Sequence, residues 1–288
     1  MRILVTNDDG ITSPGLHELV RAIHSNGVEV TAAAPLEDCT GAGAGVGEGY
    51  RKGSVSFRRY EIPGAADVQA FGVDALPALI VLVGCLGGFG EPPDLVVSGI
   101  NLGLNTGPAV LHSGTVGAAL TALHFQTSAL AVSVQPFEPV CWDTAAKLAA
   151  RVINQMKDLP AASMVNLNVP GLPSDEVRGV RRADLCRRGP FRSPERSSAG
   201  NGPLGGLQVK EDGSGIGTVT LDLGWPTQLK RGSKNDAEFA QSERTSGFPS
   251  DTDLVDAGYA AVTVLTLVHE DSQPSAAVLL KNLEALQP

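Results

Sequence analysis

The amino-acid sequence predicts an α/β fold with a mostly parallel sheet, and three observations support this prediction. Short apolar runs alternate with helical segments from residue 1 to about residue 170, which is the pattern of strands joined by helical crossovers. The chain has 288 residues, 42% of them hydrophobic, so it can build a sizeable core. After Pro173 the character changes, and residues 187–217 are rich in glycine, proline and serine. We therefore expect a core over residues 1–172 and an extension of long loops and hairpins over residues 173–288.

Five short apolar runs bounded by turn residues are the predicted core strands. They are Ile3–Thr6, Val28–Ala34, Leu95–Ser98, Leu130–Val134 and Met164–Val169. The segments between them predict helices at Gly15–Ser25, Asp74–Cys85, Thr115–Phe125 and Asp143–Lys157. The first of these helices has apolar residues at the spacing of a face that packs on a sheet. In the extension we expect a returning core strand near residues 252–268 and an amphipathic helix from Ser275 onward.

Composition and charge argue against several classes of function. A net charge of -9 disfavours binding to a nucleic-acid duplex. The longest uncharged run, Ala75–Gly90, is too short to span a bilayer, and no signal-peptide pattern precedes the first strand. We therefore expect no membrane partner and a cytoplasmic location. The four cysteines show no metal-ligand spacing, and the arginine-rich stretch from Arg178 to Arg196 fits a solvated loop, an inter-subunit surface or an anion-attracting patch.

Two adjacent aspartates, Asp8 and Asp9, follow the first predicted strand. Open α/β sheets bind ligands at the carboxyl ends of their strands. Neighbouring carboxylates repel each other, and a hard divalent cation such as Mg²⁺ or Mn²⁺ would keep both ionised. The alternative is an ordinary solvated turn, because Asp and Gly are common turn residues.

A second loop follows the strand at Leu95–Ser98, in the sequence PPDLVVSGINLGLNTG of residues 92–107. Asn101 offers a neutral carbonyl ligand for a metal, while Asn105 and the glycine amides suit an anion. Alternatively, these residues serve only the turns. The loop at residues 34–45 follows the second strand in the same way, and its Thr40 offers a hydroxyl group.

The sequence HSGTVGAALTAL at residues 112–123 predicts an anion site at a helix start. Ser113 is a good N-cap, and the unpaired amides that follow would bind phosphate with help from the helix dipole. Ser113, Gly114 and Thr115 are therefore candidate phosphate-binding residues, with plain capping as the alternative. His112 is a candidate general acid, with a packing role as its alternative.

These motifs together resemble those of the SurE family of metal-dependent nucleoside monophosphate phosphatases. The matching segments are ILVTNDDGITSPG at residues 3–15, PDLVVSGIN and the following Gly and Asn residues at 93–107, SGTVGAA at 113–119, VNLNVP at 165–170 and, more faintly, TDLVDAGYAAVTVL at 252–265. The resemblance implies a Rossmann-like three-layer core, an extension that makes a homodimer or tetramer, and one divalent metal per subunit.

Carried over position by position, the resemblance implies site residues in this chain. Asp8, Asp9 and Asn101 match metal ligands, Thr40 falls where the family usually has a serine ligand, and Ser113, Gly114 and Thr115 match the phosphate-binding loop. Asp8, Asp9, Asn101 and Ser113 are the expected catalytic residues. The segments TGAGAGVGEG at 40–49 and GVDALPAL at 72–79 differ from the family pattern, as does His112 in place of a tyrosine.

The sequence therefore predicts a phosphomonoester hydrolase whose substrate is a small phosphorylated molecule. Nucleoside 5'-monophosphates are the expected substrates. The altered segments keep open a specialised phosphatase for a phosphorylated metabolite, and also an inactive metal- or nucleotide-binding homologue. A phospho-receiver domain is a fourth hypothesis, but Asp67 and Asp74 are poorly placed for a phosphoacceptor.

Overall fold

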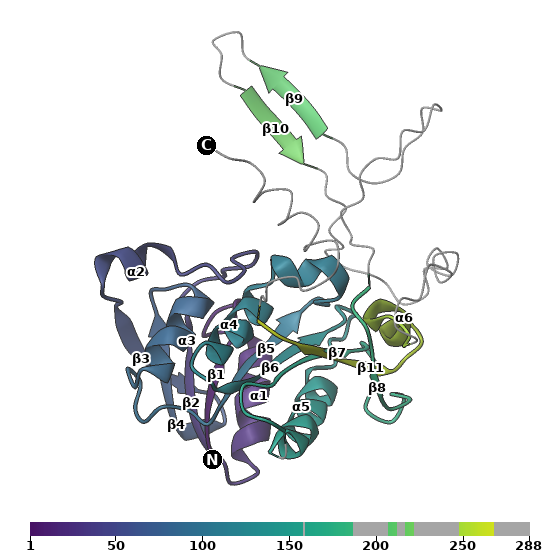
Figure 1. The fold of residues 1–288 in the computed structure, drawn as a ribbon, viewed down its shortest axis with the longest axis horizontal. Helices are drawn as coiled ribbons and strands as arrows, with labels where there is room; N and C mark the ends of the chain where they lie inside the picture. Colours follow the sequence, from purple (N-terminus) through teal and green to yellow (C-terminus); the bar gives the residue numbers. More distant parts are fainter. Residues whose placement is uncertain (158, 187–206, 212–216, 222–247, 268–288) are drawn as a thin grey trace, which may run out of the picture.

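The structure is a computed structural model that describes residues 1–157, 159–186, 207–211, 217–221 and 248–267. It confirms an α/β fold in which helices cover both faces of a mostly parallel sheet (Figure 1). In the described residues, the sheet comprises β1 (Arg2–Thr6), β2 (Glu29–Pro35), β3 (Phe57–Ile62), β4 (Ala65–Val73), β5 (Leu95–Leu102), β6 (Ser128–Val134), β7 (Met164–Val169), β8 (Val180–Arg182) and β11 (Ala260–Leu265).

The strand order is β3-β4-β2-β1-β5-β6-β7-β11-β8, and it places a topological switch point beside β1. From β1 the chain runs to β2 on one side and later returns to β5 on the other side, with both neighbours parallel to β1. The helices that follow β1 and β5 therefore lie on opposite faces of the sheet. Such a switch point leaves a crevice at the carboxyl ends of the strands, where α/β proteins bind ligands.

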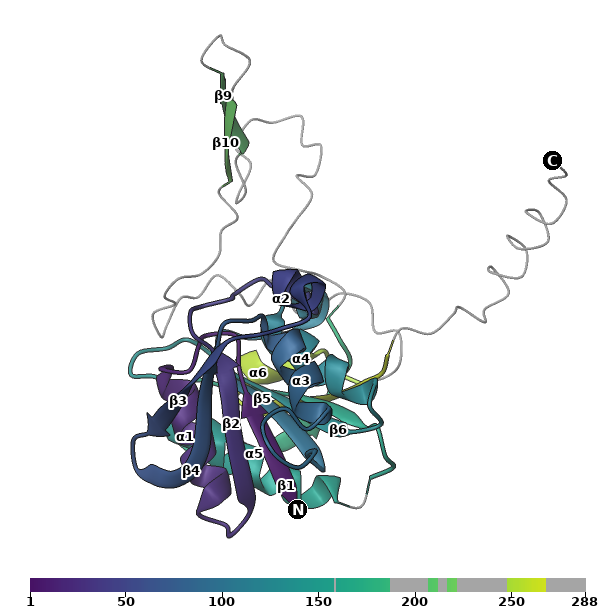
Figure 2. The ribbon, with the colours of Figure 1, turned by 90° about the vertical axis from the view of Figure 1, so that its left-hand side faces the viewer.

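The sheet lies between two layers of helices (Figure 2), and two apolar cores hold the three layers together. On one face, α1 (Pro14–His24) and α5 (Trp142–Met156) pack on the sheet through buried residues that include Leu19 and Ile153. On the other face, α3 (Pro77–Cys85) and α4 (Gly114–Leu123) pack through residues that include Ile80 and Val116. No helix in the described residues has both the length and the apolar character that a membrane crossing requires.

The five predicted strands and four predicted helices are present, with ends that shift by a few residues. The prediction missed β3 and β4 on one edge of the sheet, the short helix α2 (Gly47–Lys52) and the 3-10 turn η1 (Gly107–Leu111). Strand β3, with the sequence FRRYEI, contains three charged residues and is mostly exposed, so its apolar signal is weak. Near residues 252–268, where the sequence predicts a returning strand, the structure has β11 (Ala260–Leu265), and the short helix α6 (Asp251–Asp256), which was not predicted, precedes it.

The residues beyond 172 contribute both to the main sheet and to a separate hairpin. Strand β11 pairs antiparallel with β7 and parallel with β8. Strands β9 (Leu207–Glu211) and β10 (Gly217–Leu221) pair only with each other in the described residues. The predicted boundary at residue 172 stays a prediction, and the predicted helix from Ser275 lies outside the described residues.

Candidate active site

The first turn of the chain is built to present two carboxylates at the end of β1. The Asn7 side chain closes the turn twice: its amide nitrogen donates to the Gly10 carbonyl, and its oxygen accepts from the Gly10 amide, both at 3.1 Å. Gly10 has a φ of 100°, a conformation that favours glycine. Asp8 and Asp9 are therefore held between a buried strand and the capped start of α1.

Asp8 is the more deeply buried of the two and is fixed by helix α4. Its side chain is 2% exposed, and its Oδ1 accepts a hydrogen bond of 2.5 Å from the Thr115 hydroxyl. Its backbone carbonyl accepts from the Cys39 amide at 2.7 Å, which ties the loop after β2 to the same turn. Burial raises the pKa of Asp8, and the hydrogen bond from Thr115 opposes this rise.

Asp9 carries a buried oxygen atom, Oδ2, that has no hydrogen-bond partner in the structure. Burial, followed by the negative charges of Asp8 and Asp38, raises the pKa of Asp9 to about 7. Asp38 is a carboxylate whose influence the sequence analysis missed, although it stands two residues before Thr40. The described residues contain no group of three or more His, Cys, Asp or Glu side chains able to hold a metal, so further ligands would be neutral oxygens.

Asn101 and Thr40, the predicted neutral ligands, differ in how they are engaged. The Asn101 side-chain nitrogen donates to the Gly103 carbonyl at 2.7 Å, which assigns the nitrogen as donor and leaves the carbonyl oxygen available as a ligand. The Thr40 hydroxyl donates to Asp38 at 2.6 Å, and its amide donates to the same oxygen at 2.7 Å. Thr40 is exposed, and its role as a metal ligand stays a prediction.

The start of α4 lies directly against Asp8. A Cβ atom built on Gly114 would come within 2.7 Å of the Asp8 Cβ and 2.8 Å of its Oδ2, so only glycine fits between the helix and the carboxylate. The Ser113 hydroxyl caps the helix by accepting from the Val116 amide at 3.0 Å. The structure thus brings the predicted anion site and the predicted metal pair together. Thr115 is fully buried, and its hydroxyl is directed to Asp8.

Asn105 is held in a buried polar network beneath the loop. Its amide donates to the Asn168 side chain at 2.8 Å, and its carbonyl accepts from the Asn166 and Asn168 side chains. Its own side-chain nitrogen donates to the Ser133 hydroxyl at 2.9 Å. Asn105 therefore fastens the loop after β5 to β6 and β7, and its phosphate-binding role stays a prediction.

The glycine-rich loop after β2 packs on the same helix. The Gly43 amide donates to the His112 carbonyl at 3.1 Å, and a Cβ atom on Gly117 would meet the Gly43 carbonyl oxygen at 2.2 Å. The His112 side chain is exposed beside the helix start, and its role as a general acid stays a prediction. The contacts between this loop and α4 are therefore made by backbone atoms.

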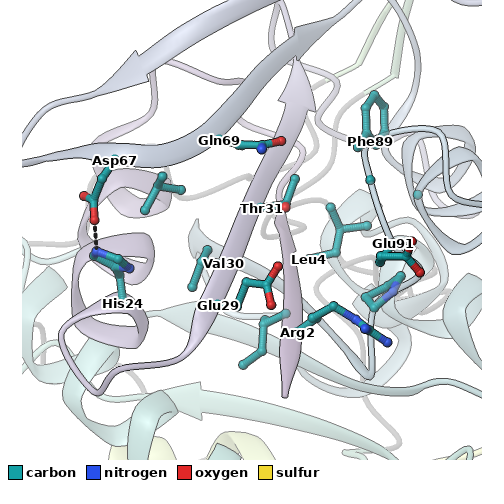
Figure 3. A pocket seen from close by; sticks show the side chains of 15 residues that line it. Arg2, Leu4, His24, Glu29, Val30, Thr31, Asp67, Gln69, Phe89 and Glu91 are labelled. Atoms are coloured by element: carbon teal, nitrogen blue, oxygen red, sulfur yellow. Dashed lines mark hydrogen bonds and ion pairs between the residues drawn. The ribbon is translucent and has the colours of Figure 1, made fainter.

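A separate hollow of about 310 Å³ lies at the opposite end of the sheet. Figure 3 shows side chains from the starts of β1, β2 and β4 around it, with His24 and Asp67 in contact at 2.9 Å. Arg2, Glu29 and Glu91 line the hollow with charges of both signs. It contains none of the predicted site residues, so it is distinct from the candidate active site.

Comparison with known proteins identifies the family to which the sequence of this chain is similar. Residues 3–191 match the sequence profile of the family described as survival protein SurE. The chain is 40% identical over 192 residues to 5'-nucleotidase SurE of Chloroflexus aggregans, covering 65% of this chain and 74% of that protein. It is 33% identical over 242 residues to 5'-nucleotidase SurE of Pseudomonas syringae, covering 80% and 93%. The crystal structure of the SurE protein from Aquifex aeolicus has the same fold, with a TM-score of 0.69, 24% identity and coverage of 99% and 100%.

Proposed function

Because this chain belongs to the survival protein SurE family, we propose that it is a divalent-metal-dependent phosphomonoester hydrolase acting on nucleoside 5'-monophosphates. The observation that carries the proposal is the contact between Gly114 and Asp8. It sets a helix start suited to phosphate beside a pair of carboxylates suited to a cation. Relatives that bear the name 5'-nucleotidase SurE support the substrate class.

The residues present fit a hard divalent cation. Asp9 Oδ2 is buried without a partner, and burial, followed by the negative charges of Asp8 and Asp38, raises the pKa of Asp9, as expected of a site completed by positive charge. Asp8, Asp9 and the Asn101 carbonyl would hold the ion, which we propose to be Mg²⁺ or Mn²⁺. When bound, the ion would supply Lewis-acid polarisation of a phosphate oxygen.

The chain's own residues account for binding and orientation of the phosphate. The amides at the start of α4, after the Ser113 cap, would donate to phosphate oxygens and offset the charge that develops during hydrolysis. Thr115 holds Asp8 in place through its hydroxyl. Asp8 Oδ1 already accepts a hydrogen bond, so Asp9 Oδ2, which is buried without a partner, is the oxygen left for the ion.

A specialised phosphatase for another phosphorylated metabolite is the second candidate. The glycine-rich loop at residues 41–49 packs on α4 with few side chains, so it offers little to recognise a nucleobase. Both candidates share the chemistry and differ only in the part of the substrate beyond the phosphate.

We also propose a homodimer or tetramer in the cytoplasm. The extension beyond residue 172, with its β9–β10 hairpin, supports an oligomer because it contains elements that do not join the main sheet. The four free cysteines are in keeping with a reducing compartment.

The test is phosphate release by the purified protein with Mg²⁺ or Mn²⁺, across nucleoside monophosphates and sugar or metabolite phosphates, beside Asp8→Asn. Metal-dependent turnover that the variant loses supports the proposal, and the preferred substrate separates the two candidates. Turnover that survives both EDTA and Asp8→Asn would contradict it.

A further inference from the structure

A buried carboxylate that the proposed chemistry does not use lies behind the active-site loop. Asp251, the first residue of α6, is 0% exposed and accepts three hydrogen bonds from backbone amides. Its Oδ2 accepts from Gly107 at 2.9 Å, and its Oδ1 accepts from Cys186 and Thr252 at 2.9 Å each. One side chain thus joins three segments that are distant in sequence.

The first of these segments leads directly to the phosphate site. Gly107 begins η1, the turn that runs to His112 and the Ser113 cap of α4. Gly107 has a φ of 51°, and a Cβ atom there would meet the Cys186 carbonyl oxygen at 2.5 Å. The turn is therefore pressed against the backbone at Cys186 and has little room to shift.

The second and third segments both belong to the chain beyond residue 172. Cys186 is the last described residue before residue 207, and Asp251 lies just after the described chain resumes at residue 248. The two segments are themselves joined, because the Asp251 amide donates to the Asp184 carbonyl at 2.8 Å and the Asp184 amide donates to Pro249 at 3.1 Å. The Thr252 hydroxyl adds a contact of 3.1 Å to the Thr106 hydroxyl.

We propose that Asp251 is a positioning residue of the active site. It fixes the turn that leads to Ser113, and it ties this turn to the backbone at Cys186 and to the start of α6. The inference rests on the proposed phosphatase function. Its physical basis is that charge-assisted hydrogen bonds from amides to a buried carboxylate are strong, and that small displacements of binding groups slow catalysis. Asp251 touches neither the proposed metal ligands nor the phosphate-binding amides.

Asp251→Asn is the decisive variant because it keeps the shape of the side chain. The Asn oxygen can still accept from Cys186 and Thr252, but its NH₂ group then faces the Gly107 amide, donor against donor. We expect kcat to fall by about tenfold or more, and the affinity for Mn²⁺ to change by less than about threefold, since Asp8 and Asp9 stand on another loop and Asn101 is held within strand β5. Hydrogen exchange should accelerate in peptides covering residues 103–112 and not in those covering β1 or β6.

The matched control is Asp253→Asn, which removes the same charge from an exposed position of the same helix turn and should leave kcat and exchange unchanged. Thr252→Val, which loses only the contact to Thr106, is the milder variant if Asp251→Asn fails to fold, and it should lower kcat by a smaller factor.

Unchanged kcat and unchanged exchange in a folded variant, measured well below its Tm, would overturn the proposal. Wild-type protein without turnover would instead contradict the proposed function, while the exchange data would still decide whether Asp251 fixes the turn.

Discussion

At the scale of single residues, Asp9 places function in conflict with stability. Its folded-state pKa is raised from 3.8 to about 7, mainly by burial and then by Asp8 and Asp38. The unfolded chain therefore releases this proton at lower pH than the folded chain, and the charged side chain destabilises the metal-free fold increasingly as the pH rises from about 4 to about 7. We expect metal-free Asp9→Asn to be more stable than the wild type at pH 8, by about 1 kcal/mol or more, with a smaller difference at pH 5.

Thermal unfolding in EDTA at both pH values measures this difference. Asp67→Asn is the control, because it removes an exposed carboxylate. This variant should show no comparable gain in stability at pH 8. Asp9→Asn should at the same time lose most of the metal-dependent turnover, which is the usual exchange of stability for activity at a strained site. If the stability difference between Asp9→Asn and the wild type is the same at both pH values, the pKa of Asp9 is not raised by folding.

Gly114 sets the distance between the phosphate site and Asp8, and Gly114→Ala tests it. The added methyl group would overlap Asp8, so we expect kcat/KM to fall by about tenfold to a hundredfold and stability by about 1–3 kcal/mol. Gly84→Ala is the matched control, because its Cβ would meet the Leu4 side chain at 2.5 Å in the core. The control should lose similar stability and keep its activity below its Tm, and equal losses of activity would contradict a specific role for Gly114.

At the scale of elements, the start of α4 has two tasks that can be separated. The Ser113 hydroxyl caps the helix, and the amides behind it are proposed to bind phosphate. Ser113→Ala should cost about 1 kcal/mol of stability and raise the inhibition constant of inorganic phosphate severalfold. Ser113→Thr retains a hydroxyl cap and should restore most of both. If phosphate inhibits Ser113→Ala as well as it inhibits the wild type, the Ser113 cap does not contribute to phosphate binding.

The elements that form the site could be predicted because their signals are local. β1 and β5 are short, apolar and buried, and each is followed at once by the polar residues that it positions. The prediction failed at β3 and β4, where the strands lie toward an edge of the sheet. Most side chains of β3 are exposed there, so charged residues interrupt the apolar pattern without preventing the strand.

The charge effect of Asp38 and the hydrogen bonds of Asp251 could not be predicted either, and the reason is a different one. The charge of Asp38 acts on Asp9 only because the loop after β2 folds back onto the turn after β1. Asp251 meets Gly107 across 144 positions of the sequence. No local pattern encodes such contacts, and the sequence therefore supplied candidate ligands without showing how they are held.

At the scale of the whole molecule, the sheet topology explains why these distant segments meet. The crossovers after β1 and β5 diverge to opposite faces, so the loops after both strands open into one crevice. Strand β11 returns from the end of the described chain to pair with β7, and the residues just before it supply Asp251 behind the same crevice. The proposed site, with Asp251 as its positioning residue, thus draws on both ends of the described chain.

Metal binding should consequently stabilise the entire fold. An ion that binds only the folded state at a hundred times its dissociation constant adds about 2.7 kcal/mol, which for a chain of this size raises Tm by about 4–5 °C. We expect this shift on adding Mn²⁺ or Mg²⁺ and its reversal by EDTA, measured by differential scanning calorimetry. Asp8→Asn should lose the shift, whereas Asp67→Asn should keep it. An equal shift in Tm for the wild type and Asp8→Asn would mean that the stabilising ion binds elsewhere, because Asp8 is one of the proposed metal ligands.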